Sequence, residues 1–167
     1  MTNESGYLET NGARIYYEVE GDGSPLLLIH GGLGSLRMWD GVVPALTDRY
    51  RVIRYDTRGF GQTETEDVEF SNRADAIAVL DHLEAASAVV VGQSRGGNIA
   101  LDLAIEHPQR VTALVSVAGG VGGHQGEFPR GPRNRRGTRS NAWRRRAIGI
   151  LSPSSRPGSG SMAGGSR

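Results

Sequence analysis

The sequence predicts an α/β protein with a doubly wound, mostly parallel β-sheet. Short apolar runs rich in β-branched residues alternate with amphipathic stretches from the start of the chain to about residue 120. Strands that alternate with helices pair in parallel through right-handed crossovers. We therefore expect a functional site where the carboxyl ends of these strands meet at one edge of the sheet.

Six segments carry the aliphatic, aromatic and β-branched side chains that are typical of strands: residues 7–10, 13–20, 25–30, 51–56, 87–92 and 110–119. The turn signal Asn11-Gly12 predicts that the first two form a hairpin. The third is an uninterrupted apolar run, which indicates a strand that is buried on both faces.

Two helices are predicted between these strands. Ser71 is a suitable N-cap for a helix that runs to about residue 86. A second helix covers residues 96–107. A third amphipathic stretch, residues 36–49, contains Gly41 and Pro44, which weaken a continuous helix.

Charge is distributed unevenly along the 167 residues. Residues 1–124 contain 17 acidic residues and 9 arginines, whereas the remainder contains ten arginines and one acidic residue. Arginine, glycine, serine and proline dominate residues 121–167, so we expect residues 1–120 to be the folded part and residues 121–167 to be a disordered basic tail. With no cysteine, signal peptide or membrane-length apolar run, we expect a soluble cytoplasmic protein without a cofactor, a metal or a membrane partner.

Ser94 lies between a predicted strand and a predicted helix, in the sequence Gly92-Gln93-Ser94-Arg95-Gly96. This is a G-x-S-x-G pattern, which in a strand–turn–helix setting raises a serine hydroxyl above the sheet. The backbone N–H of Arg95 would begin the helix and point at a developing oxyanion. Gly92 and Gly96 are needed because a side chain at either position would clash where the strand and helix backbones approach. The alternative is an ordinary turn with an inert serine.

Four motifs occur in the order and spacing of a known family: HGGLG at residues 30–34, Trp39, DTRGFGQT at residues 56–63 and GQSRGG at residues 92–97. On these motifs, residues 7–120 resemble the N-terminal half of the α/β-hydrolase fold, in the branch that has a serine nucleophile. The wording of residues 38–63 is similar to 3-oxoadipate enol-lactonase and carboxylesterase members.

The resemblance implies that the family hydrolyses a small ester or lactone through an acyl-serine on Ser94. It places the oxyanion hole at the backbone N–H groups of Arg95 and of Gly32 or, as a second choice, Leu33. A serine at the elbow argues against dehalogenase and epoxide-hydrolase chemistry, because those members use a carboxylate nucleophile. Structural rather than catalytic roles are expected for the other motif residues: His30, Gly31, Asp56, Arg58, Gly59, Gly92 and Gly96.

The catalytic triad of this fold follows the chain order serine, acid, histidine. The acids and histidines after Ser94 are Asp102, Glu106, Glu127, His107 and His124. The first two acids and His107 belong to the helix that leaves Ser94, and His107 lies about 20 Å along it from the serine. His124 has no well-placed acid beside it. We therefore expect an incomplete hydrolase that is inactive as written.

Two explanations of the basic tail remain open. One is translation in a shifted reading frame after about residue 119 or 122, because off-frame codons of a GC-rich gene enrich these residue types without apolar periodicity. The other is a natural extension that binds nucleic acid or another polyanion through charge, a function that we rank below hydrolysis. Without a further strand beside it, the strand at residues 111–117 would present an unpaired sheet edge, which favours non-specific self-association.

The reading-frame explanation makes a prediction about the coding DNA. After about codon 120, one of the other two forward frames should encode a lid, a strand that ends in a Gly-x-x-Asp-like turn, and a later loop with a histidine. The reason is that buried elements impose apolar periodicity on the correct frame alone. Reading the DNA in all three frames tests this. If neither alternative frame shows the pattern, salt-dependent retention on immobilised nucleic acid becomes the test of a native tail.

Overall fold

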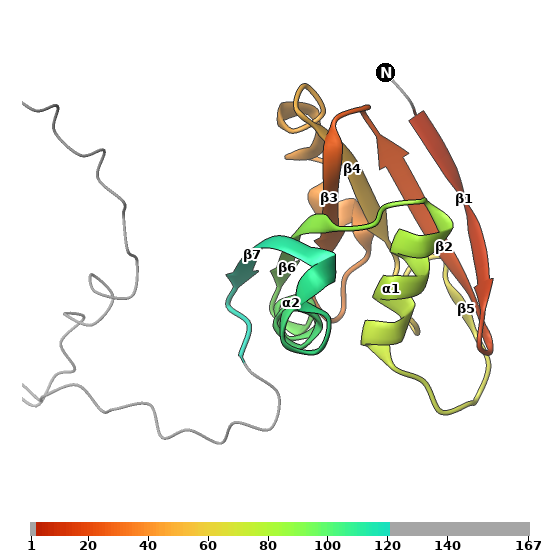
Figure 1. Ribbon diagram of the computed structural model, residues 1–167. Helices are drawn as coiled ribbons and strands as arrows, with labels where there is room; N and C mark the ends of the chain where they lie inside the picture. Colours follow the sequence, from red (N-terminus) through yellow and green to blue (C-terminus); the bar gives the residue numbers. More distant parts are fainter. Residues whose placement is uncertain (1–2, 121–167) are drawn as a thin grey trace, which may run out of the picture. The chain divides into compact units, whose positions relative to one another are not determined.

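The sheet of the computed structural model has the strand order β1-β2-β4-β3-β6-β7, with β5 paired to β2 (Figure 1). The structure describes residues 3–120. The strands in this part of the chain are β1 (Asn3–Thr10), β2 (Ala13–Glu20), β3 (Ser24–Ile29), β4 (Tyr50–Tyr55), β5 (Glu64–Thr65), β6 (Ala88–Gln93) and β7 (Val111–Val117). The helices are α1 (Asn72–His82) and α2 (Arg95–Glu106), and short 3-10 turns are η1 (Leu36–Trp39), η2 (Val43–Ala45) and η3 (Pro108–Arg110).

The sheet is mixed. β1 and β2 form the predicted hairpin, with Thr10 opposite Ala13, and β2 runs antiparallel to β4. The strands β4, β3, β6 and β7 are parallel. The chain passes from β3 to β4 on one side and later places β6 on the other side of β3, so the strand order reverses between β3 and β6. Open α/β sheets bind ligands at such a reversal, outside the carboxyl ends of the strands.

Both faces of the sheet bury apolar side chains, which confirms the predicted α/β class. On one face, Leu27 and Ile29 of β3 belong to the core cluster that includes the apolar sides of α1 and α2. On the other face, Leu26 and Leu28 pack with Val43 of η2. Alternate residues of β3 therefore face opposite cores, as expected for a central strand that is buried on both sides.

The predicted helices are confirmed, with changes at their boundaries. Ser71 caps α1 by accepting a hydrogen bond from the N–H of Ala74 at 3.4 Å. α1 ends at His82, short of its predicted end, because Glu84 takes a left-handed conformation with φ of 55°. Residues 36–49 contain the turns η1 and η2 in place of an α-helix, which agrees with the helix-weakening glycine and proline in this stretch.

β7 is the last strand of the sheet in the described part of the chain, and β6 is the neighbour with which it pairs there. Val115 and Val117 of this strand are 48% and 49% exposed. Self-association through the β7 edge stays a prediction. The expected disordered tail, residues 121–167, lies outside the described residues. Within residues 3–120, no helix combines the length and the hydropathy needed to cross a membrane.

Candidate active site

Ser94 occupies a one-residue turn between β6 and α2. β6 ends at Gln93 and α2 begins at Arg95, so the chain passes from strand to helix at the serine alone. Ser94 has φ of 51° and ψ of −115°, a conformation that is rare for a residue with a side chain. Its side chain makes no capping hydrogen bond to α2, and the residue is exposed. The hydroxyl is therefore presented to solvent at the carboxyl edge of the sheet.

Two glycines allow this turn because the strand and helix backbones meet beneath it. A Cβ at Gly92 would collide with the carbonyl group of Gly96, and a Cβ at Gly96 would collide with the carbonyl of Ile29 at the end of β3. The clash predicted at both positions is confirmed. In addition, the N–H of Ser94 donates to the carbonyl of Val117 at 2.8 Å. The turn is thus held by β3, β6 and β7 together.

The loop after β3 lies beside the first residue of α2. A Cβ at Gly32 would stand 3.7 Å from Cδ of Arg95, so the two segments expected to supply oxyanion donors are neighbours. Arg95 opens α2, and its backbone N–H consequently has no partner within the helix. Leu33 is 98% exposed and has φ of 63°. The donor roles of Arg95, Gly32 and Leu33 remain predictions.

His30 is fully buried, and both of its ring nitrogens are occupied. Nε2 accepts from the backbone N–H of Thr57 at 2.9 Å, which leaves Nδ1 to carry the proton and donate to the carbonyl of Gly31 at 2.7 Å. Burial lowers the pKa of His30, so the neutral ring is favoured. This residue links the loops after β3 and β4, in agreement with a structural role, and its ring has no nitrogen left to act on Ser94.

Asp56 holds two neighbouring loops through its buried carboxylate. One oxygen accepts from the N–H of Leu36 at 2.7 Å, and the other accepts from the N–H of Gln62 at 2.8 Å. Gly61 has φ of 56°, and a Cβ there would collide with this carboxylate. Backbone N–H donors satisfy the charge of Asp56 where the side chain is removed from water. These contacts agree with a loop-organising role.

Arg58 and Asp75 form a buried bidentate ion pair. Nε and Nη2 of Arg58 each donate to one carboxylate oxygen at 2.8 Å, and each residue is 3% exposed. The pair joins the loop after β4 to the first turn of α1. Arg58 also donates to the carbonyl of Asn11 in the hairpin turn. Gly59, the next motif residue, has φ of 80°, a conformation that favours glycine.

The match to a known family extends well beyond these motifs. A family model for the alpha/beta hydrolase fold matches residues 24–164. The chain belongs to the α/β-hydrolase family. Among relatives, the 2-hydroxymuconate semialdehyde hydrolase of Pseudomonas sp. (strain CF600) is 42% identical over 111 residues, which cover 62% of this chain and 39% of that protein. The soluble epoxide hydrolase of Corynebacterium sp. (strain C12) is 35% identical over 107 residues, which cover 62% of this chain and 37% of that protein.

Solved structures of hydrolases also match the chain. The crystal structure of naproxen esterase from Bacillus subtilis superimposes with a TM-score of 0.65 at 25% sequence identity, and the match covers 71% of this chain and 44% of that one. The chain spans about two fifths of the length of the curated relatives that it matches. The match that shows the family therefore covers only part of the length of these hydrolases.

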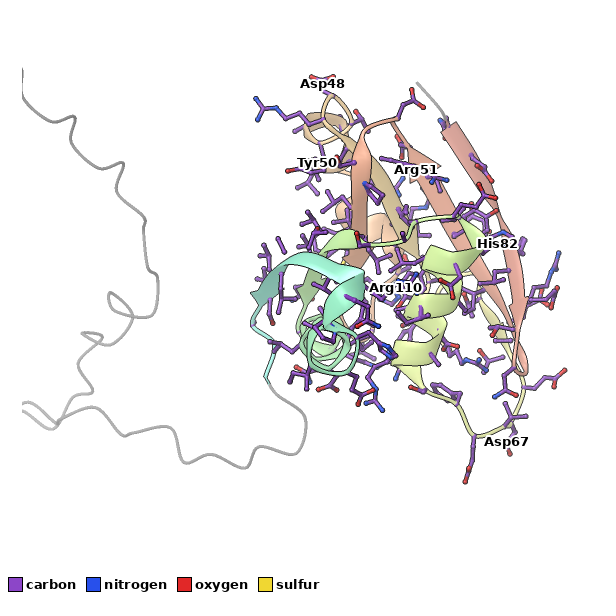
Figure 2. All side chains as sticks on the ribbon, viewed as in Figure 1. Asp48, Tyr50, Arg51, Asp67, His82 and Arg110 are labelled. Atoms are coloured by element: carbon purple, nitrogen blue, oxygen red, sulfur yellow. The ribbon has the colours of Figure 1, made fainter. Side chains whose placement is uncertain are left out.

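Besides His30, the part of the chain that the structure describes contains two histidines, and both lie away from Ser94. His82 ends α1 at the side of the sheet where β4 begins (Figure 2), since Arg51 of β4 donates to the carbonyl of Leu83 at 2.7 Å. That side carries the amino ends of the parallel strands, opposite the edge that carries Ser94. His107 follows the last residue of α2, about 20 Å along the helix from the serine.

The acids of α2 are also engaged away from Ser94. Asp102 and Glu106 lie 3.7 Å and 2.7 Å from the guanidinium nitrogens of Arg73 on α1, so they bridge the two helices. His124 and Glu127 lie outside the described residues. Within residues 3–120, the structure brings together Ser94 and the loop after β3, and it brings no histidine into a hydrogen bond with Ser94.

The side chain of Arg95 makes contacts for which the sequence offers no signal. Nη1 donates to Oγ1 of Thr57 at 2.7 Å, and Nη2 donates to Oδ1 of Asn72 at 3.0 Å. The guanidinium also stands 5.0 Å from the ring centroid of Phe60. Arg95 thereby connects the elbow to the loop after β4 and to the start of α1.

An ion-pair network covers part of the sheet face that lies away from α1 and α2. Arg54 of β4 is 5% exposed and pairs with Glu18 at 2.7 Å and Glu20 at 2.8 Å, both on β2. Arg37 of η1 also pairs with Glu18. One signal was available in the sequence: Arg54 alternates with Val52 in a predicted buried strand, which indicates an inward-facing charge that needs a partner.

Burial of a neutral His30 makes the stability of the fold pH-dependent. In the unfolded chain the ring regains its ordinary pKa of about 6.5, so the unfolded state binds the proton first as pH falls. The free energy of unfolding should be highest above about pH 6.5 and decline as pH drops through that value. Denaturant titrations across this range measure the decline, and His30→Gln should flatten it. The same pH dependence in His30→Gln and wild type would contradict a buried neutral ring.

Proposed function

We propose that Ser94 is the nucleophile of a serine hydrolase fold that cleaves small esters or lactones through an acyl-serine. The observation that carries the proposal is the strained backbone of Ser94 at the junction of β6 and α2. Backbone strain of this kind clusters at functional sites, and a serine in this setting is a nucleophile elbow. The structural similarity to an esterase agrees with an ester substrate.

The proposed reaction is acyl transfer in two steps. Oγ of Ser94 attacks the carbonyl carbon while a base takes the hydroxyl proton, and the carbonyl oxygen becomes an oxyanion. In this proposal, the backbone N–H groups of Arg95 and of Gly32 or Leu33 stabilise that charge. The alkoxide then leaves with a proton, and water hydrolyses the acyl-serine to release the acid.

The residue at the elbow separates this proposal from epoxide opening. A soluble epoxide hydrolase is among the relatives. In the present chain a hydroxyl, not a carboxylate, stands at the nucleophile position Ser94. An activated hydroxyl attacks acyl carbons well, which favours an ester or lactone over an epoxide.

The proposal includes inactivity of the chain as written. A serine hydroxyl that lacks a base stays protonated and is a poor nucleophile. The described residues place no histidine at Ser94, and the acids of α2 are paired with Arg73. Turnover would therefore require a base and an acid from the C-terminal half of the hydrolase.

Hydrolysis of p-nitrophenyl acetate tests both parts of the proposal. The full chain and Ser94→Ala should release p-nitrophenol at the same background rate. A chain in which the alternative reading frame restores the C-terminal half should gain turnover in the ordinary enzyme range, about 1–10³ per second. Ser94→Ala should abolish this gain, whereas the matched control Ser87→Ala should retain it.

Two results would count against the proposal. A rate of the chain as written that is lost in Ser94→Ala would contradict its inactivity. Turnover by the restored chain that persists in Ser94→Ala would contradict the role of Ser94 as the nucleophile.

A further inference from the structure

A pocket of about 270 Å³ lies beside the elbow, between the first turns of α1 and α2. Asn72 and Arg73 contribute polar groups from α1, and Arg95 and Asn98 contribute polar groups from α2. Phe70 and Ile99 also line the pocket and are apolar. Arg95, the residue after Ser94, lines the pocket, whereas Ser94 itself does not.

Within residues 3–120, the guanidinium of Arg95 forms no ion pair with a carboxylate. It donates hydrogen bonds to two neutral oxygens, Oγ1 of Thr57 at 2.7 Å and Oδ1 of Asn72 at 3.0 Å. Buried arginines elsewhere in the described structure have carboxylate partners, as Arg58 does in Asp75. A partly buried cation without an anion favours the entry of one. The part of the pocket beside Arg95 therefore has an electrostatic preference for a negative ligand.

The other polar groups of the pocket add hydrogen-bond donors. Asn72 uses its side-chain oxygen to accept from Arg95, and Asn98 uses its own to accept from the N–H of Gly120 at 2.6 Å. Each side-chain amide is thereby oriented, and its NH2 group remains as a donor. Oγ of Ser71 likewise accepts from the N–H of Ala74, so its hydroxyl proton is left to donate. Donors of this kind match the oxygens of an anion.

Asp102 is the acidic residue that lines the pocket, and it shares the guanidinium of Arg73 with Glu106. Its carboxylate lies 3.7 Å from Nη1 of Arg73, while Nε of Arg73 lies 2.7 Å from Glu106. Asp102 is also about two helical turns from Arg95 along α2. The end of the pocket nearest the elbow consequently keeps the positive charge.

We propose that this pocket binds the carboxylate of a small organic acid. The carboxylate accepts hydrogen bonds from Arg95 and from the amides of Asn72 and Asn98. The apolar part of the acid lies against Phe70 and Ile99, which is why a carboxylate is favoured over inorganic phosphate. The inference does not depend on the reaction of Ser94, so binding and hydrolysis can fail separately.

Titration of benzoate into the 15N-labelled full chain, followed by amide chemical shifts, tests the inference. Saturable shifts are expected at residues 71–73 and 95–99. Arg95→Gln should raise the dissociation constant of benzoate by about tenfold or more, because a charged hydrogen-bond partner is lost. Arg49→Gln is the matched control: it removes the same charge from an exposed side chain near the start of β4, and the residues of the pocket do not include it.

A second variant guards against a folding defect in Arg95→Gln. Asn98→Asp retains the oxygen that accepts from Gly120, yet it removes the amide donors and adds a negative charge. This variant should also raise the dissociation constant of benzoate by about tenfold or more. The ten arginines of residues 121–167 are the same in every variant, so their contribution cancels.

Three results would overturn the inference. The first is the absence of saturable shifts at the pocket residues. The second is equal weakening of benzoate binding by Arg95→Gln and Arg49→Gln, or unchanged benzoate binding in Asn98→Asp. The third is tighter binding of inorganic phosphate than of benzoate, which would show that charge alone determines binding and that Phe70 and Ile99 do not contribute.

Discussion

The structure depends on a strand that becomes a helix within one residue. At Ser94 the backbone takes φ of 51°, which costs roughly 1 kcal/mol or more for a residue with a side chain. The surrounding contacts hold this conformation: Gly92 lies against Gly96, Gly96 lies against the end of β3, and the N–H of Ser94 bonds to Val117 of β7. Three neighbouring parallel strands thus converge on the serine.

Buried polar groups then fix the loops around this turn. His30 joins the loop after β3 to Thr57, and Asp56 joins Leu36 to Gln62 through its two carboxylate oxygens. Each of these groups is removed from water and satisfied by hydrogen bonds to the backbone, so movement of one loop would leave another group unsatisfied. The loop after β3, which carries the predicted oxyanion donors Gly32 and Leu33, is thereby fixed, and donors on a fixed loop need no reorganisation when charge develops on a substrate.

Local patterns in the sequence predict both helices, the cap at Ser71, the glycines of the elbow and every strand of residues 3–120 except the two-residue β5, because each follows from periodicity or from a steric need at neighbouring positions. They do not predict the side-chain contacts of Arg95. Its partners Thr57 and Asn72 are 38 and 23 residues away, and the fold alone brings them together. The stretch at residues 36–49 shows the same limit: its apolar spacing reports burial correctly but not the type of turn.

The most direct test of the central claim is the free energy of unfolding of Ser94→Gly, measured by denaturant titration of the full chain beside Ser87→Gly. Glycine adopts positive φ without strain, so Ser94→Gly should be more stable than Ser87→Gly by roughly 1 kcal/mol or more. Ser87 is a suitable control because it stands just before β6 and does not have positive φ. Equal losses of stability in the two variants would show that the turn at Ser94 stores no strain, and the account of the elbow given above would then be wrong.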